Sequence, residues 1–511
     1  MNKKTYYITT PIYYPSGDLH LGHLFTTTQA WVMRNFKRSQ GYDSIMVTGA
    51  DEHGQKIYEK AIENKMEPQK YVDMQSQKFI DLWKLAQIDN DLFIRTSSEK
   101  HKLIIKKIFT SLFKKGFIYK GEYKGLYSIS DEEFVTEANA KFENGKYYHP
   151  TSGHELTVLS EESYFFKLNT FYDWLVNEFL IDENVESKNV INELKANFLQ
   201  TTVEDLSVTR IKIDWGIRID EDPKHVIYVW LDALFNYITV LNYSEIDQSL
   251  YEKYWNNGTE RVHIIGKEIA RFHCIYWPIF LKSLDIKLPT KIVPHGWIIT
   301  PTGKMSKSKN NVVDPVQLLK EFDPEEVKYF LVAKLNMFKD SVFSKELLIN
   351  AINSDLANNF GNLISRTTKM IENNFDRPLL YKESESEVIN DVYKKAEIYY
   401  ENFKKFMNSY ESDEAYSQII LIAKELNNLI DSTEPWKLDK NDPLLEQILI
   451  ALMNGIYIMA LAYKNVMPNK IAMLEKQWNN IEIAERLISD KNKFSFFKIT
   501  KGNILFKRLT L

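Results

Sequence analysis

Tyr6-Tyr7-Ile8-Thr9-Thr10 opens the segment that decides the fold, because this run of aromatic and β-branched residues predicts a β-strand. It is followed by His20-Leu21-Gly22-His23 and then by a helical stretch from Leu24 to Arg38. The helix is expected to stop before Gly41, a residue that suits the C-cap position. The segment therefore predicts a strand, turn and helix unit.

Two histidines stand at the start of that helix. His20 and His23 are three residues apart and share one face of the first turn, while Gly22 lets a ligand approach closely. Free backbone N–H groups and the positive end of the helix dipole attract anions there, and imidazole adds donors. The turn predicts a phosphate site, although two histidines near a helix start can also be ordinary surface or cap residues.

A second segment far along the chain is also suited to phosphates. Lys304-Met305-Ser306-Lys307-Ser308 follows Gly303 and lies between Pro301 and Asn310-Asn311, which predicts a loop. Its mobile ammonium groups can neutralise a triphosphate and stabilise the charge that grows on a pyrophosphate leaving group. Alone it could be a solvated basic turn, but together the two segments predict a split nucleotide site.

The two segments resemble the HIGH-type and KMSKS signatures of class I aminoacyl-tRNA synthetases, with Leu21 in place of the isoleucine. Further segments, in order along the chain, resemble methionyl-tRNA synthetases. They are Ile8-Thr9-Thr10-Pro11-Ile12-Tyr13-Tyr14, Gly49-Ala50-Asp51-Glu52-His53-Gly54, Asp205-Leu206-Ser207-Val208-Thr209-Arg210, Tyr228-Val229-Trp230-Leu231-Asp232-Ala233, Ile265-Gly266-Lys267-Glu268-Ile269, Arg271-Phe272-His273 and His295-Gly296-Trp297.

The resemblance implies a two-step reaction with L-methionine, ATP and tRNA(Met), both initiator and elongator. The carboxylate of methionine attacks the ATP α-phosphate, and the terminal ribose hydroxyl of the tRNA then attacks the adenylate. No protein nucleophile is needed, so catalysis rests on alignment and charge stabilisation. Mg²⁺ accompanies ATP. The resemblance assigns His20 and His23 to the ATP phosphates, Lys304 and Lys307 to pyrophosphate, and Gly22, Gly266, Glu268, Met305, Ser306 and Ser308 to ATP binding.

A methionine pocket needs aromatic faces for a polarizable thioether and one anion for the substrate ammonium. The resemblance places Asp51 at the ammonium, and at the side chain it places Ile12, Tyr14, Trp230, Ala233, Tyr237, Ile269 and His273. Without the motif, Trp230 and Tyr237 would be interpreted as core residues. Asp51-Glu52-His53 could also be a surface acidic turn or a metal site, but three consecutive side chains cannot all point at one ion.

The composition agrees with a large intracellular enzyme. The chain has 511 residues, 44% of them hydrophobic, which predicts two to four domains. The charge balance is 65 − 69 = −4, so any RNA contact must come from local patches. The N-terminus has no apolar signal core, so a cytoplasmic protein without a membrane segment is expected, and Ile448 to Tyr463 is interpreted as a buried bundle helix.

Cys274 is the only cysteine. Many methionyl-tRNA synthetases carry a zinc knuckle built mostly of cysteines, and here Tyr127-Ser128-Ile129-Ser130-Asp131 and His149-Pro150-Thr151-Ser152-Gly153-His154 stand at those places. A thiolate site cannot be built from them, and only a residual site of Asp131, His149 and His154 is conceivable. The prediction is no structural zinc.

The predicted fold is an α/β doubly wound Rossmann-type parallel sheet, split by an inserted connective domain and followed by an α-helical anticodon-binding bundle. The sheet is expected to resume at Val226 to Trp230 and to continue at Val262–Ile265 and Ile292–Val293, and a helix is expected to start at Asp323-Pro324. The predicted parts are 1–115 (first catalytic half), 116–225 (connective), 226–320 (second half with the KMSKS loop), 321–350 (stem-contact linker) and 351–511 (anticodon-binding domain with a C-terminal extension).

In the bundle, the resemblance assigns Asn362, Arg366, Pro435 and Trp436 to the anticodon. Trp436 is expected to stack on a base, while Asn362 and Arg366 hydrogen-bond base edges. Without the resemblance, a tryptophan beside a proline is more often a packing residue. The sequence ends at Leu511 without an appended tRNA-binding or dimerisation domain, so a monomer is expected.

Three rival interpretations are less favourable. Leucine, isoleucine and valine enzymes share both signatures but usually carry a large editing insertion, for which the residues between Gly116 and Pro223 leave too little room. Cysteinyl enzymes need a zinc–thiolate pocket, which a sequence with one cysteine cannot supply. A non-catalytic RNA-binding paralogue should have lost pocket residues, and His20, His23, Asp51, Trp230, His273, Lys304 and Lys307 all remain.

Overall fold

The computed structural model describes residues 3–15, 17, 19–128, 133–135, 137, 140–150, 152–200, 202–211, 213–305, 311–484, 502 and 504–510. The chain folds into two compact units. Unit 1 comprises Met1–Leu19, Asp43–Trp83 and Asp89–Pro294, and unit 2 comprises His20–Tyr42, Lys84–Ile88 and His295–Leu511.

A five-stranded sheet forms the centre of unit 1, in the order β13-β12-β1-β2-β3. Its strands are β1 (Thr5–Tyr13), β2 (Asp43–Ala50), β3 (Leu92–Arg95), β12 (Glu260–Gly266) and β13 (Lys291–His295). β1 pairs in parallel with both β2 and β12, so that Ile8 lies opposite Met46 on one side and Val262 on the other. The order reverses between β1 and β12, which confirms the predicted doubly wound sheet and marks the place where such sheets bind ligands.

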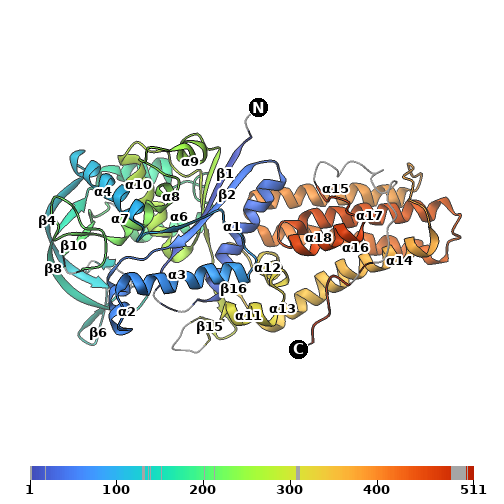
Figure 1. The fold of residues 1–511 in the computed structure, drawn as a ribbon, viewed down its shortest axis with the longest axis horizontal. Helices are drawn as coiled ribbons and strands as arrows, with labels where there is room; N and C mark the ends of the chain where they lie inside the picture. The colour runs from blue at the N-terminus through green and yellow to red at the C-terminus, as the bar shows by residue number, and fades with distance from the viewer. Residues whose placement is uncertain are drawn as a thin grey trace. The chain divides into compact units, whose positions relative to one another are not determined.

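Helices and short turns pack around this sheet (Figure 1). The main apolar core includes Tyr7, Val47, Phe235, Ile265 and Trp277, while α2 and α3 form a separate small cluster through Ile57, Ala61, Tyr71 and Val72. The helices are α2 (Gln55–Glu63), α3 (Pro68–Leu85), α4 (Glu99–Lys114), α5 (Tyr172–Trp174), α6 (Lys188–Phe198), α7 (Val229–Leu234), α8 (Asn236–Thr239), α9 (Ser249–Tyr251) and α10 (Trp277–Ser283), and the shorter or wider turns are η1 (Leu168–Phe171), η2 (Leu175–Phe179), η3 (Glu252–Asn256), η4 (Lys267–Ile269) and η5 (Phe272–Tyr276).

The connective segment is built on a long antiparallel pair, β4 (Ile118–Ser128) and β8 (Glu155–Phe166). Residues Ser163 to Phe166, at the end of β8, alternate between polar and aromatic side chains in part, as strands with one buried face do. Leu126, Val135 and Leu156, on the neighbouring strands β4, β5 and β8, form a small apolar cluster. Short strands complete the region: β5 (Glu133–Val135), β6 (Lys141–Glu143), β7 (Lys146–Tyr148) and β9 (Leu206–Ser207).

The prediction that the parallel sheet resumes at Val226 to Trp230 is wrong. β11 covers only Val226–Ile227 and pairs antiparallel with β10 (Thr209–Arg210). Tyr228 is already the N-cap of α7, so Trp230 is helical. A short apolar run does not distinguish a strand from a buried helix, and here the parallel sheet resumes only at β12.

Unit 2 begins with α1 (Leu21–Ser39), which ends before Gly41 as predicted; Gly41 has the positive φ of +85° that glycine tolerates. A three-stranded sheet flanks the KMSKS loop, with β14 (Ile298–Thr300) and β15 (Gly303–Lys304) before it and β16 (Ser341–Val342) after it. α11 (Pro315–Glu321), α12 (Pro324–Ala333) and α13 (Lys345–Ala351) come next. The predicted start of α12 is confirmed, because Asp323 accepts the amides of Glu325 and Glu326 at 2.9 and 3.4 Å.

The rest of unit 2 is the predicted helical bundle. Its members are η7 (Ile352–Gly361), α14 (Asn362–Asn374), α15 (Glu387–Asn408), α16 (Ser412–Thr433), η8 (Pro435–Lys437), α17 (Pro443–Lys464) and α18 (Pro468–Gln477). α15, α16 and α17 lie side by side (Figure 1). The ring centroid of Tyr416 on α16 lies 5.4 Å from that of Phe403 on α15 and 6.1 Å from that of Tyr463 on α17.

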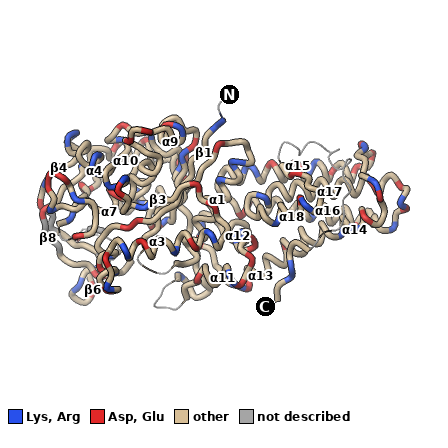
Figure 2. The backbone as a smooth tube through the Cα atoms, viewed as in Figure 1, with Lys and Arg blue, Asp and Glu red and all other residues tan. Residues whose placement is uncertain are grey.

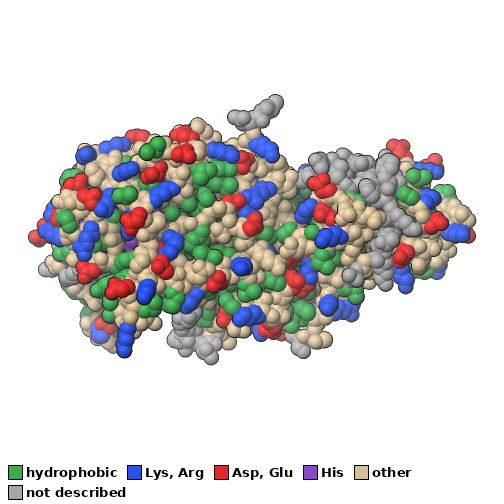
Figure 3. Space-filling view, viewed as in Figure 1, with side chains coloured by type: hydrophobic (Ala, Val, Ile, Leu, Met, Phe, Trp, Pro, Cys, Tyr) green, Lys and Arg blue, Asp and Glu red, His purple; other side chains and the backbone are tan. Residues whose placement is uncertain are grey.

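α17 is long and apolar enough to cross a bilayer, and it is the one such helix in the described part of the chain. Most of its apolar stretch is buried within the bundle, which confirms the interpretation of Ile448 to Tyr463 as a core helix. Lysine, arginine, aspartate and glutamate positions alternate along the backbone of both units (Figure 2), and the same mixture covers the face drawn in Figure 3.

Candidate active site

The two signature histidines cap α1. His20 is the N-cap residue, and its Nδ1 accepts the amide of Gly22 at 3.1 Å. The amide of His20 donates in turn to Nδ1 of His23 at 3.1 Å, and the two rings stack 3.9 Å apart. The histidines share one face as predicted, but the Gly22 amide, which the pattern left available to an anion, donates to His20.

This arrangement fixes the chemical state of the rings. Burial, followed by the charge of His20, lowers the pKa of His23 well below its ordinary value. Because Nδ1 accepts an amide proton in both rings, a neutral ring carries its own proton on Nε2. An Nε2–H group is a donor that a phosphate oxygen can accept. Gly22 leaves room for this arrangement, since a Cβ at this position would lie 3.0 Å from the His20 ring and the ring would have to shift.

The second signature is tied to the first within unit 2. Lys304 ends β15 and is exposed, with Nζ 3.8 Å above the ring of Trp297, and Met305 is half-buried. Ser306, Lys307 and Ser308 lie outside the described residues. Beyond the loop, Asn311 donates to the carbonyl of Lys304 at 3.2 Å, and the amide of Leu21 donates to the carbonyl of Val313 at 3.1 Å. The base of the loop is therefore bonded to the start of α1.

The residues predicted to bind methionine all lie in unit 1, and most follow the carboxyl ends of strands that neighbour one another in the sheet. Asp51 comes directly after β2 and is buried. Trp230 and Ala233 lie on α7, Tyr237 lies on α8, and the ring of Trp230 stacks 3.5 Å from that of Phe272. Ile12 and Tyr14 are at the end of β1, and Ile269 and His273 are in the turns η4 and η5 after β12.

Tyr237 and His273 form a directed pair. Nδ1 of His273 is 3.0 Å from the carbonyl of Ile269, which can only accept, so Nδ1 carries the proton. Nε2 then accepts from the Tyr237 hydroxyl at 2.7 Å. Burial lowers the pKa of His273 to about 4 and raises that of Tyr237. The pair therefore presents neutral, polarizable groups, which suits a thioether.

Gly266 and Glu268, predicted to bind adenosine, lie at the end of β12, beside the point where the strand order reverses. The Glu268 carboxylate folds back over Gly266, so closely that a Cβ on Gly266 would lie 2.4 Å from its oxygen. A side chain at position 266 would push Glu268 away. The glycine thus sets the position of the carboxylate.

Glu52 and His53, which follow Asp51, bind different partners through their side chains. The Glu52 side chain is fully buried and binds Arg95 at 2.7 Å, with Ser76 and Ser97 as further donors. Nδ1 of His53 bonds Asp232 at 2.6 Å. Asp232 and its second partner, His101, were not among the predicted residues, although an acid inside the apolar run Tyr228 to Ala233 was a usable signal.

Comparisons with known proteins agree with this geometry. A family model described as class I tRNA synthetases (M) matches residues 6–368. The methionine–tRNA ligase of Mycoplasmopsis pulmonis is 55% identical over 509 residues, which covers 100% of both chains. The chain belongs to the class I methionyl-tRNA synthetases.

Two more relatives extend this membership. The methionine–tRNA ligase of Bacillus subtilis is 41% identical over 525 residues, covering 99% of this chain and 78% of that protein. The solved structure of Mycobacterium tuberculosis methionyl-tRNA synthetase in complex with methionyl-adenylate has a TM-score of 0.92 and 30% identity, and covers 99% of this chain and 100% of that one. The sheet and the bundle described above are therefore those of a methionyl-tRNA synthetase.

In this synthetase, the residues weighed as a residual zinc site are engaged in a turn. Asp131 lies outside the described residues. Nδ1 of His149 accepts the amide of Ser152 at 3.1 Å, and the amide of His149 donates to the carbonyl of His154 at 2.8 Å. Since Cys274 is the only cysteine of the sequence, these groups do not fit a thiolate zinc site.

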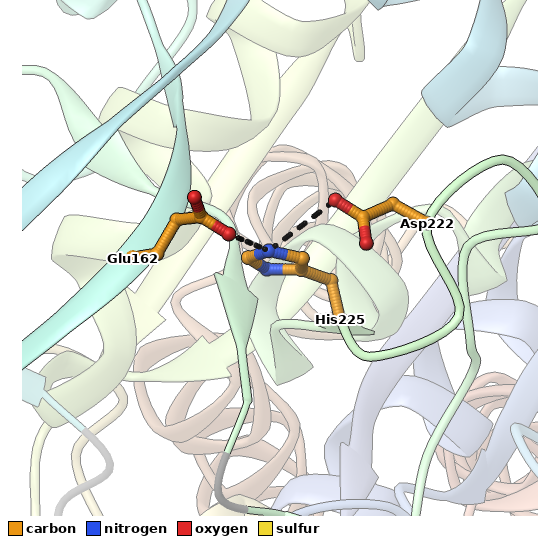
Figure 4. Close-up of side chains that lie close together, drawn as sticks. All are labelled: Glu162, Asp222 and His225. Atoms are coloured by element: carbon orange, nitrogen blue, oxygen red, sulfur yellow. Dashed lines mark hydrogen bonds and ion pairs between the residues drawn. The ribbon is translucent and has the colours of Figure 1, made fainter.

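A different cluster, Glu162, Asp222 and His225, brings three potential metal ligands together (Figure 4). Nε2 of His225 lies 3.2 Å from Glu162 and 3.5 Å from Asp222. Lys120 binds both carboxylates at 3.0 and 2.8 Å, and Lys224 binds Glu162 at 2.6 Å. These ammonium groups hold the pKa of Glu162 at about 2, so the cluster is neutralised by lysines and does not resemble a metal centre.

The predicted anticodon residues lie at one end of the bundle helices α14 and α16. Asn362 begins α14 and is exposed, and Arg366 follows one turn later on the same face, 4.0 Å from Asp431 of α16. Trp436 lies in η8 with 53% of its surface exposed, whereas Pro435 is buried. Core packing therefore does not account for Trp436.

Proposed function

We propose that this protein is an ATP-dependent methionine–tRNA ligase. It forms methionyl-adenylate and pyrophosphate from methionine and ATP, and then transfers methionine to initiator and elongator tRNA(Met). The observation that carries this proposal is the tie between the two signatures, in which the segment after the KMSKS loop bonds to the start of α1 through Val313 and Leu21. Transfer to tRNA follows from membership of the family.

For the phosphates, we assign His20 and His23 as donors to ATP and Lys304 and Lys307 as partners of the departing pyrophosphate. Groups aimed at charge that develops in the transition state accelerate the reaction more than groups that bind the substrate alone. Gly22, Met305, Ser306 and Ser308 supply backbone and hydroxyl contacts to ATP. Mg²⁺ arrives as part of the ATP complex and bridges phosphate oxygens.

For methionine and adenosine, we assign the groups of unit 1. Asp51 takes the substrate ammonium, since a buried carboxylate compensates the cost of burying a cation. Glu268 binds the ribose hydroxyls beside Gly266. The thioether contacts the neutral Tyr237–His273 pair, and Ile12, Tyr14, Trp230, Ala233 and Ile269 complete the pocket.

For tRNA, we propose that Trp436 and Pro435 stack an anticodon base and that Asn362 and Arg366 hydrogen-bond base edges. The functional parts are those predicted from the sequence: 1–115 and 226–320 as the catalytic halves, 116–225 as the connective domain, 321–350 as the stem-contact linker and 351–511 as the anticodon-binding domain. We further propose that the protein acts as a monomer in the cytoplasm and without structural zinc.

The test is ATP–pyrophosphate exchange with each of the twenty amino acids, with Mg²⁺ and without tRNA. Exchange with methionine alone is expected. Exchange with a different amino acid would mean that the Trp230 pocket is misassigned. No exchange with any of them, in protein that is folded and binds tRNA, would favour the non-catalytic RNA-binding alternative.

A further inference from the structure

Asp232 is a buried carboxylate with two histidine partners and no place in the catalytic roles assigned above. Its Oδ2 accepts from Nδ1 of His53 at 2.6 Å, and its Oδ1 accepts from Nε2 of His101 at 2.6 Å. His101 is held in turn by Thr239 at 2.7 Å. Asp232 and His101 have no exposed surface and His53 has 3%, so the three side chains bond to one another inside unit 1.

The carboxylate is ionised despite this burial. Desolvation alone would raise the pKa of Asp232, but the electrostatic interaction with His53 and the hydrogen bonds from His101 and His53 outweigh it, and the pKa lies below its ordinary value. A buried ion of this kind is tolerated only where its partners satisfy it. The three side chains therefore form a unit whose geometry is strongly determined.

The network connects two parts of the proposed methionine site. Asp232 lies on α7 between Trp230 and Ala233, which are three residues apart and so share one face of the helix. At 100° per residue, Asp232 points to the opposite side of α7 from Trp230. His53 lies two residues after Asp51 in the loop that follows β2. The bond between Asp232 and His53 thus links two elements. One is α7, whose other face carries Trp230, and the other is the loop after β2, which carries Asp51.

The rest of that loop is held independently. Trp215 donates from Nε1 to the carbonyl of Glu52 at 2.5 Å, and the Tyr14 hydroxyl donates to the carbonyl of His53 at 3.0 Å. The Glu52 side chain is fixed by Arg95. These contacts hold the backbone of the loop, and the bond from His53 to Asp232 attaches the loop to α7. The spacing between Asp51 and Trp230 is then set through Asp232.

We propose that Asp232 is a positioning residue for methionine activation, which acts through His53 to keep the ammonium partner Asp51 and the Trp230–Ala233 face of α7 at one fixed spacing. The inference rests on the proposed function. It is specific to methionine, because neither Asp51 nor α7 belongs to the groups assigned to the ATP phosphates.

The main experiment measures ATP–pyrophosphate exchange for Asp232→Asn and wild type, with separate titrations of methionine and ATP. The KM for methionine should rise about tenfold to a hundredfold, as small displacements of binding groups do, while the KM for ATP changes less than about twofold. A double-mutant cycle with Asp51→Asn should be strongly non-additive, because both changes act on the same contact. Asp247→Asn, at an exposed surface position of unit 1, is the matched control.

Conservative variants keep the test decisive if Asp232→Asn folds poorly. His53→Asn retains an amide donor near the position of Nδ1, and His53→Ala removes it. The KM for methionine should stay near the wild-type value in His53→Asn and rise in His53→Ala, with circular dichroism confirming that both fold.

Each alternative result overturns the proposal. Equal increases of both KM values, additive effects with Asp51→Asn, or a lowered melting temperature with an unchanged KM for methionine would make Asp232 a purely structural residue. If instead the wild-type protein shows no methionine-dependent exchange, it is the proposed function that fails.

Discussion

His273 shows how burial sets the chemistry of a single residue. Its pKa is lowered to about 4, so the native protein keeps it neutral while an unfolded chain protonates it below pH 6.5. Between pH 6.5 and pH 4, the unfolded chain protonates His273 and the native protein does not. The free energy of unfolding is therefore higher at pH 7 and decreases as the pH falls. The free energy of unfolding should drop by about 2 kcal/mol from pH 7 to pH 5 because of this residue.

Urea unfolding of the whole protein at both pH values, followed by tryptophan fluorescence, measures that drop. His273→Gln cannot titrate and should show a pH dependence weaker by about the same 2 kcal/mol. An identical pH dependence in the two proteins would mean that His273 is not buried as a neutral ring. His154→Gln is a suitable control, since that histidine is exposed.

At this scale, residue types were predictable but their partners were not. The resemblance placed His273 and Tyr237 in the pocket, yet the direction of their hydrogen bond depends on the Ile269 carbonyl, which a sequence does not reveal. Asp232 and His101 are 131 positions apart, so their contact exists only through the fold. Local sequence patterns therefore do not predict which distant residues will hydrogen-bond a buried carboxylate.

Among the elements, the start of α1 combines helix stability with the proposed chemistry. Gly22→Ala should favour the helix by about 0.5–1 kcal/mol, because alanine restricts the unfolded chain. Its Cβ would nevertheless lie 3.0 Å from Nδ1 of His20 and displace that ring. The methionine-dependent exchange rate should therefore fall at least about tenfold while the melting temperature does not decrease.

The two readouts separate the possible causes. Unchanged exchange in Gly22→Ala would show that the His20 ring can move without loss of activity. A joint fall of exchange and melting temperature would indicate a damaged helix start. Gly145→Ala provides a glycine control on a connective-domain turn, where the positive φ of +80° should lower stability without affecting exchange.

Elements with local signals were predicted well. α12 begins at Asp323 because the carboxylate caps the amides and Pro324 has a preset φ, and both signals lie within four residues. Val226 to Trp230 was mistaken for a strand of the main sheet because its partner, Thr209–Arg210, and the helical turn that follows are set by tertiary packing. Strand pairing depends on distant segments, and helix capping does not.

At the scale of the whole molecule, the proposed functions divide between activation and tRNA recognition. The doubly wound sheet with its insertion followed from the two signatures and the resemblance, and the bundle followed from helical periodicity. The grouping of His20–Tyr42 with the C-terminal unit did not, because it arises from bonds such as that between Leu21 and Val313. Local sequence patterns predict individual helices and strands. Which of these elements group into one compact unit depends on hydrogen bonds and contacts between distant segments.

This division predicts that the two steps can be separated by mutation. Trp436→Ala removes a ring that is 53% exposed in η8, so the protein should remain folded. Loss of one base stack costs about 1–3 kcal/mol, which corresponds to a decrease in kcat/KM for charging of tRNA(Met) of about fivefold to 150-fold. Methionine-dependent pyrophosphate exchange without tRNA should stay at the wild-type rate, because activation does not involve the anticodon.

The matched variant is Trp436→Phe, which keeps an aromatic face and should recover most of the charging activity. Aminoacylation assays with wild-type tRNA(Met) and with a transcript whose anticodon is replaced make the comparison complete. If Trp436 stacks on an anticodon base, the alanine variant should lose its discrimination between the two tRNAs. Equal losses of charging and exchange would instead place the effect of Trp436 on folding of the bundle, and an unchanged kcat/KM would remove it from the tRNA interface.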